Sequence, residues 1–149
     1  MTRFATLVAA LIVAACGAAL PAATPAPTVE KTVPPVSIPP GAVVIELDIP
    51  PNNVSEFHQN GVLVTELHVL AGKPYVIRVN NPSNFDHNFY IGGAKDLAAR
   101  EYGRLVGIKL WSNGTRELVH TFKAGELIQF ACTLAGHYGN MHADIVVDQ

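Results

Sequence analysis

The 149-residue sequence is poor in cysteine and in charge. It contains two cysteines, Cys16 and Cys132, and 15% charged residues, with a formal net charge of -2. Lysine and arginine form no run, whereas nucleic-acid-binding domains usually carry a basic patch or stripe. No nucleophile is paired with a base in a context that supports catalysis. We therefore predict neither a nucleic-acid partner nor an enzyme.

The sequence also lacks a long apolar run. The apolar segment at residues 4–15 is too short for a mature membrane-spanning helix, which needs about 20 residues. It follows Arg3, as in the signal peptides of exported proteins, and it ends in "VAAC", which resembles the bacterial lipobox. The resemblance implies cleavage before Cys16, lipidation of Cys16 and anchoring at the periplasmic or extracellular face of a membrane. The alternative is an ordinary secretory signal, with Cys16 removed or incidental.

Proline is concentrated in one segment. Seven of the eleven prolines lie within residues 17–40, which show neither a helical nor a strand period. Such a composition is typical of an extended, semi-rigid spacer. We predict a signal peptide over residues 1–15, a lipidated Cys16 with a Pro-rich linker over 16–40, and one folded domain over 41–149.

Residues 41–149 have the pattern of an all-β domain. In "VVIELDI", residues 43–49, every second side chain is apolar and shares one face, as in a half-buried strand. Residues 94–104 contain helix formers without this alternation and predict a short helical insertion. About seven or eight short strands separated by turns indicate an antiparallel β-sandwich. The other strand-like segments are residues 62–70, 75–81, 87–93, the two parts of 119–132 on either side of a turn at Ala124-Gly125, and 142–148.

Three candidate metal ligands lie in one short segment near the C-terminus. In "CTLAGHYGNM", Cys132, His137 and Met141 are five and four residues apart. Thiolate and thioether sulfurs are soft donors that suit Cu(I), and imidazole suits copper generally. Gly136 and Gly139 give the segment freedom to turn around one point. A blue-copper site needs a second imidazole in addition to these three donors.

The second imidazole is expected at His87. It follows the polar stretch "NNPSNFD" and begins "HNFYI", so it stands where a loop meets a strand. His58 lies in a polar stretch, and His68 falls on the more polar face of a strand. His120 lies within another strand, beside Val119 and Phe122. These three histidines are better explained as ordinary surface or strand residues.

With this histidine included, the sequence resembles a known family. "HNF" at 87–89 and "FACTLAGHYGNMHADIVV" at 130–147 resemble the type 1 copper site of the cupredoxins, the plastocyanin–azurin family. The resemblance extends from about residue 41 to the C-terminus and implies a Greek-key β-sandwich with one mononuclear copper ion. By this match the equatorial ligands are His87, Cys132 and His137, and the axial ligand is Met141.

The resemblance also implies supporting residues and shows two departures. Asn88 matches the family's asparagine after the first histidine, and Thr133 is its expected hydrogen-bond partner. Many members have proline where this sequence has Ala135, so the loop is expected to be less stiff. The sequence leaves open whether His142, directly after Met141, or the carbonyl of Asp86 contacts the metal.

One-electron transfer is the function that this site predicts. The carrier is expected to be a monomer that meets its redox protein partners transiently. The alternative is a delivery module that hands Cu(I) to a membrane oxidase or another acceptor, with His142 as a spare donor. A cupredoxin-like domain without metal is a third possibility, and the complete ligand set argues against it.

Overall fold

The structure is a computed structural model that describes residues 36–52 and 55–149. The predicted signal peptide, the lipidation site at Cys16 and linker residues 17–35 lie outside the described residues. Within the described ranges, no helix is long and apolar enough to cross a membrane.

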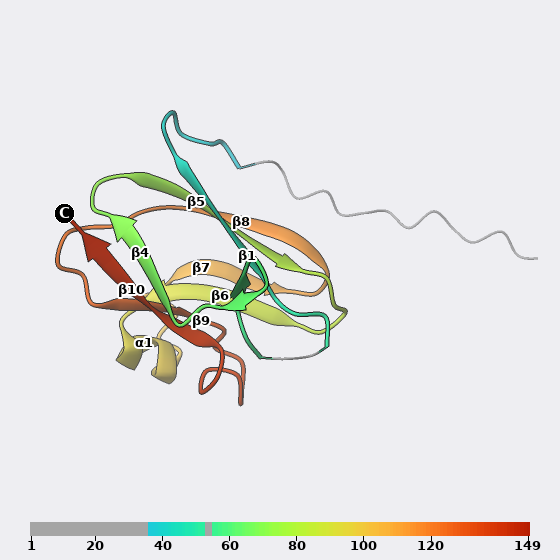
Figure 1. The fold of residues 1–149 in the computed structure, drawn as a ribbon. Coiled ribbons are helices and arrows are strands. Elements are labelled where there is room, and N and C mark those ends of the chain that lie inside the picture. The colour runs from blue at the N-terminus through green and yellow to red at the C-terminus, as the bar shows by residue number, and fades with distance from the viewer. Residues whose placement is uncertain (1–35, 53–54) are drawn as a thin grey trace, which may run out of the picture. The chain divides into compact units, whose positions relative to one another are not determined.

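The described residues form two five-stranded sheets and one short helix (Figure 1). Sheet A has the order β3-β2-β1-β5-β8, and sheet B has the order β4-β10-β9-β6-β7. The strands of sheet A are β1 (Val43–Asp48), β2 (His58–Gln59), β3 (Val62–Leu63), β5 (Pro74–Asn81) and β8 (Gly114–Thr121). The elements of sheet B are β4 (Glu66–Leu70), β6 (His87–Gly92), β7 (Val106–Trp111), β9 (Ile128–Ala131) and β10 (His142–Asp148), with helix α1 (Ala94–Ala99) beside β6 and β9.

The alternation in the sequence produces the core. In β1, Ile45 and Leu47 are buried while their neighbours Val44 and Glu46 are exposed. The inner faces of the two sheets contribute to a single apolar cluster. At its centre three aromatic rings pack together with centroid separations of 5.3 to 5.5 Å. These rings belong to Phe57, Phe89 and Phe130.

The predicted all-β sandwich with a short helical insertion is confirmed, but the sheets are mixed rather than wholly antiparallel. Strand β1 runs parallel to β5, and β10 runs parallel to β4. Alternation reports which face a side chain takes and carries no information on strand direction. Strands β2 and β3 have two residues each, too few to show alternation.

Helix α1 is shorter than the 94–104 segment from which it was predicted. It ends at Ala99, and Arg100 takes a left-handed conformation with φ 58° as the C-cap. The amide of Glu101 donates to the carbonyl of Asp96, and the amide of Arg104 donates to the carbonyl of Glu101. Residues after the cap therefore form hydrogen-bonded turns instead of further helix.

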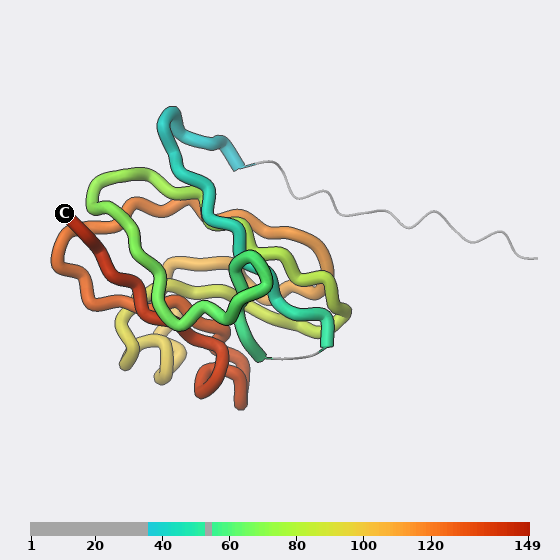
Figure 2. The backbone as a smooth tube through the Cα atoms, in the orientation of Figure 1, coloured from blue at the N-terminus to red at the C-terminus, as the bar shows by residue number. Residues whose placement is uncertain are grey.

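The chain reversals that carry the candidate ligands lie at one end of the sandwich. Ala131, the last residue of β9, pairs with His142, the first residue of β10, and also with Tyr90 in β6. Strand β1 begins at the other end, because Val43 pairs with the start of β5. Figure 2 shows the loop after β9 and the start of β1 on opposite sides of the domain.

Candidate metal centre

Three of the four predicted ligands meet at one point. One donor atom from each of His87, Cys132 and His137 lies within 4.8 Å of the other two. His87 is the first residue of β6, Cys132 follows the last residue of β9, and His137 lies in the loop between β9 and β10. The imidazole centroids of His87 and His137 are 5.2 Å apart. His87 and Cys132 are buried, whereas His137 is partly exposed.

The loop from Cys132 to Met141 is closed by its own backbone. The amide of His137 donates to the carbonyl of Leu134 at 3.0 Å, and the amide of Met141 donates to the carbonyl of His137 at 2.8 Å. The amide of Cys132 donates to the carbonyl of Met141 at 3.0 Å, which brings the two ends of the loop together. Gly136 takes φ 81°, a conformation that side chains other than glycine rarely adopt. Met141 is fully buried in the core cluster.

Asn88 and Thr133 tie the two ligand-bearing segments together. The Thr133 amide donates to Asn88 Oδ1 at 2.7 Å, and Asn88 Nδ2 donates to Thr133 Oγ1 at 3.1 Å. The Thr133 hydroxyl lies 3.4 Å from Asn88 Oδ1. Both residues are buried, and each follows a candidate ligand in sequence. These hydrogen bonds fix the position of Cys132 relative to His87.

The imidazole of His87 is buried without a hydrogen bond. Neither Nδ1 nor Nε2 has a hydrogen-bond partner among the described residues, and the residue is 0% exposed. An unpaired buried polar group costs about 1–3 kcal/mol, so native structures rarely contain one without a reason. Burial, with a further contribution from His137, lowers the pKa of His87. Both effects favour the neutral imidazole, which is the form that coordinates metals.

Cys132 is a free, buried cysteine. Burial raises the pKa of its thiol, while hydrogen bonds from the backbone amides of Asn88 and Leu134 act in the opposite direction. His137 Nδ1 lies 3.5 Å from the sulfur. Two amide donors directed at sulfur stabilise the thiolate that a metal ion requires. The donor set and its surroundings therefore fit a soft metal ion such as copper.

His142 lies apart from this cluster. It begins β10, where Met141 and Ala143 are buried on the inner side and His142 is on the outer side. Its Nδ1 donates to the carbonyl of Tyr138 at 2.8 Å, and its ring stacks on that of Tyr138 at 5.2 Å. The strand therefore turns this imidazole away from the side on which Met141 lies.

Two more histidines form hydrogen bonds with carboxylates near the surface. His58 Nε2 lies 2.8 Å from Glu56. His68 lies between Asp148 and Glu66, at 3.0 and 2.9 Å. The hydrogen bonds to these two carboxylates raise the pKa of His68. Neither residue belongs to the three-residue cluster, and nor does His120, whose ring packs against Phe122.

Solved structures with a similar fold include proteins described as copper proteins. Auracyanin A of Chloroflexus aurantiacus, described as a "blue" copper protein, shares 26% identity, with a TM-score of 0.59 over 72% of this chain and 100% of its own. Auracyanin of Roseiflexus castenholzii shares 20% identity, with a TM-score of 0.59 over 73% of this chain and 99% of its own. Rusticyanin of Thiobacillus ferrooxidans shares 16% identity, with a TM-score of 0.58 over 72% of this chain and 78% of its own. The chain has the cupredoxin fold.

The similarity of this chain to known proteins is seen in the structure and not in the overall sequence. No protein-family model matches the sequence, and a search of curated proteins found no significant match. Identity to the solved structures described above is 16 to 26%, so most side chains differ from theirs. Two of the three clustered residues, Cys132 and His137, were nevertheless recognisable as candidate ligands in the sequence, because they occupy one loop with Met141.

One residue beside the cluster could not be predicted from the sequence. The hydroxyl of Tyr102 lies 3.3 Å from Thr133 Oγ1, although Tyr102 comes from the segment after α1. Its ring also packs against Tyr90, with centroids 5.1 Å apart. No motif around Tyr102 signals this contact, because it depends on how the segment folds back over sheet B.

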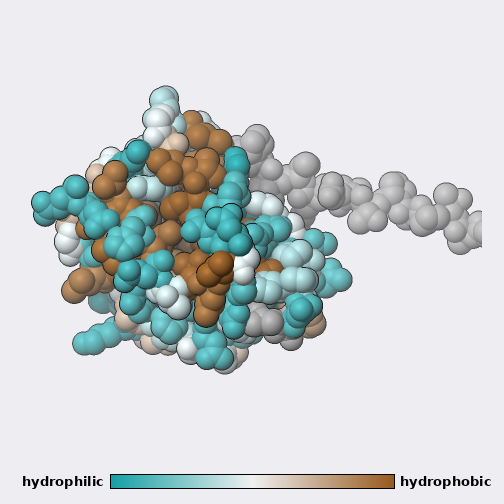
Figure 3. Space-filling model, viewed as in Figure 1, coloured by the Kyte–Doolittle hydropathy of each residue, from teal (hydrophilic) through white to brown (hydrophobic). Residues whose placement is uncertain are grey.

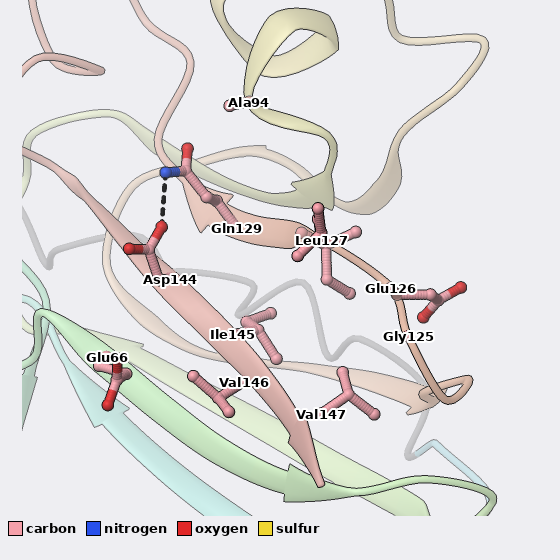
Figure 4. Close-up of a pocket in the computed structure, with 11 residues that line it drawn as sticks. Glu66, Ala94, Gly125, Glu126, Leu127, Gln129, Asp144, Ile145, Val146 and Val147 are labelled. Carbon is pink, nitrogen blue, oxygen red and sulfur yellow. Dashed lines mark hydrogen bonds between the residues drawn. The ribbon is translucent and has the colours of Figure 1, made fainter.

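The described residues also form a surface pocket of about 480 Å³. Figure 4 shows it along β10, with Leu127 at one side and the hydrogen bond between Gln129 and Asp144 at the other. Apolar side chains and the carboxylates of Glu66, Glu126 and Asp144 line it, and none of the predicted ligands does.

Proposed function

We propose that this protein is a mononuclear type 1 copper protein that carries one electron at a time between redox partners at the cell envelope. The observation that carries the proposal is the buried imidazole of His87, which has no hydrogen-bond partner among the described residues and faces Cys132 and His137. The cupredoxin fold and the copper proteins among the similar structures support the same conclusion. His87, Cys132 and His137 are the proposed equatorial ligands, and Met141 is the proposed axial ligand.

The chain supplies a set of donors whose positions are already held. Bound copper would supply a one-electron couple between Cu(I) and Cu(II). The protein's part is to keep the donors from moving when the charge of the site changes. Asn88 and Thr133, which are hydrogen-bonded to each other, directly follow His87 and Cys132 in sequence. The side chains of His87 and Cys132 are both 0% exposed. Restricted donors and excluded water reduce the rearrangement that accompanies each electron.

His137 is the proposed point at which electrons enter and leave. It is the only one of the three clustered donors that is partly exposed. Ala135 in the same loop is exposed, Leu134 is partly buried, and Phe85 before β6 is 51% exposed. Together they offer a small apolar surface for a transient partner, whose interface would bury less than about 1,200 Å².

Apolar exposure alone does not locate this docking surface. Figure 3 shows apolar side chains gathered also on the face that carries β1 and β4. Exposed apolar residues of these two strands include Val44 and Leu70. Scattered apolar surface is common on soluble proteins. The proposal therefore rests on the exposure of His137 itself and not on hydropathy.

The alternative function, delivery of Cu(I), was favoured by a possible spare donor at His142, and the position of that residue does not support it. A spare donor at His142 would assist transfer of Cu(I) to an acceptor. The Nδ1 of His142 is engaged by the carbonyl of Tyr138, and the ring lies on the outer face of sheet B. Electron transfer needs no such donor and is the function that we favour.

The optical and paramagnetic-resonance spectra of the copper-loaded protein test the proposed function. We expect an intense thiolate-to-Cu(II) charge-transfer band, a blue colour, and reversible one-electron reduction. A stable blue form would distinguish electron transfer from delivery. A colourless protein that binds Cu(I) and is not oxidised reversibly would contradict the proposal and favour the delivery module.

Anchoring at the membrane is a separate part of the proposal. We propose that Cys16 is lipidated, on the basis of the "VAAC" segment. The Cys16→Ala variant is then expected to move from the membrane fraction to the soluble fraction, because the acyl chains supply the attachment. Fractionation followed by immunoblotting measures this, with wild-type protein as the control. Equal membrane association of the two proteins would remove the lipid anchor from the proposal.

A further inference from the structure

We propose that Tyr102 is a positioning residue for the metal centre, because its hydroxyl holds Thr133 and thereby the spacing between Cys132 and His87. The inference rests on the proposed function only in naming the cluster as the copper site. The contact between Tyr102 and Thr133 does not depend on this assignment of the cluster. It gives a role to the segment between α1 and β7, which the sequence left without one.

Tyr102 completes the hydrogen bonding of a buried hydroxyl. Thr133 is 1% exposed, and its Oγ1 can accept two hydrogen bonds and donate one. Asn88 Nδ2 donates to it at 3.1 Å, and its own proton can point to Asn88 Oδ1 at 3.4 Å. The second acceptor position is filled by the Tyr102 hydroxyl at 3.3 Å, so we assign Tyr102 as the donor. All three capacities of the Thr133 hydroxyl are then used.

The segment that carries Tyr102 is held in place. Leu97 in α1 and Leu105 before β7 are buried against Ala131 of β9 in a small second core. The amide of Tyr102 donates to the carbonyl of Arg100 at 2.8 Å. Its ring packs against Tyr90, which is partly buried against the same core. A phenol on such a support can restrain Thr133 even though Tyr102 as a whole is 49% exposed.

The restraint reaches the proposed ligands through short connections. Thr133 directly follows Cys132, and its hydrogen-bond partner Asn88 directly follows His87. A change in the Thr133 hydroxyl therefore alters the geometry at both ligands at once. The supporting residues around a metal site tune its potential in this way.

The Tyr102→Phe variant tests the inference, because it removes the hydroxyl and keeps the ring against Tyr90. In the metal-free protein, we expect hydrogen exchange at the Thr133 amide to become about fivefold faster, the effect of losing one net hydrogen bond. Exchange at the amide of Val79 in sheet A serves as the internal reference for global stability. In the copper-loaded protein, we expect a shift of the reduction potential and of the charge-transfer band.

Tyr90→Phe is the matched control, since it removes a hydroxyl from the same ring pair. Among the described residues, the Tyr90 hydroxyl makes no hydrogen bond to Thr133 or Asn88, so this variant is expected to match the wild type in both measurements. Unchanged Thr133 exchange in Tyr102→Phe would overturn the inference. Faster exchange with an unchanged potential would overturn the positioning role and leave a purely structural contact.

These outcomes are separate from the proposed function. Failure of the wild-type protein to form a blue copper centre would remove the proposed function without affecting the exchange measurement. The exchange measurement would then still decide whether Tyr102 restrains Thr133.

Discussion

Cys132→Ser is expected to abolish the blue absorption of the copper-loaded protein while the domain remains folded. The thiolate is the source of the charge-transfer band, and a serine hydroxyl is a hard donor that stays protonated near neutral pH. The amides of Asn88 and Leu134 that donate to the sulfur can donate to the serine oxygen instead. The metal-free variant is therefore expected to lose no more than about 1 kcal/mol of unfolding free energy. Absorption spectra and far-ultraviolet circular dichroism measure the two effects.

His142→Ala is the matched control for this experiment. His142 is also a potential nitrogen donor of the C-terminal region, but it lies on the outer face of β10. Its removal is expected to leave the blue band intact. Retention of the band in Cys132→Ser would reject the ligand assignment, and loss of the band in His142→Ala would show that this imidazole contributes to the site.

His87→Leu is expected to act in opposite directions on metal binding and on stability. Copper binding should be lost, because the variant lacks one of the two clustered imidazoles. The metal-free protein should become more stable by about 1–2 kcal/mol, because leucine fills a similar volume without leaving polar atoms unpaired. Because His87 is 0% exposed, water does not compensate its unpaired ring nitrogens. Urea unfolding of the metal-free proteins measures the change.

His137→Leu provides the comparison for this second experiment. It also removes a proposed ligand, but His137 is partly exposed and its Nδ1 lies near the sulfur of Cys132. Its replacement should prevent copper binding with little gain in the stability of the metal-free protein. Destabilisation of the metal-free protein by His87→Leu would contradict the conclusion that the buried imidazole lacks a compensating contact.

Local features of the chain could be predicted from the sequence because neighbouring residues determine them. Ile45 and Leu47 are buried because alternate side chains of a strand take opposite faces. The donors Cys132, His137 and Met141 lie within ten residues, so one loop brings them close together whatever the rest of the fold does. Their preference for a soft metal ion can also be recognised without a structure, because it follows from the sulfur and imidazole donors themselves.

Long-range arrangement needed the tertiary structure. The parallel pairing of β1 with β5 depends on segments that are far apart in the sequence, and alternation is the same in either direction. The opposite directions of Met141 and His142 depend on where β10 begins and on its pairing with β9. Sequence alone therefore left His142 unresolved.

The sequence by itself predicted most of the strands, a candidate donor set and the preference for a soft metal ion. The tertiary structure decided that His87 is buried without a hydrogen-bond partner among the described residues, and that the hydroxyl of Tyr102 lies beside that of Thr133. The physical reason is the range of the interactions. Side-chain chemistry and strand period are local, whereas burial and the completion of a buried hydroxyl's hydrogen bonds arise only when distant segments pack against each other.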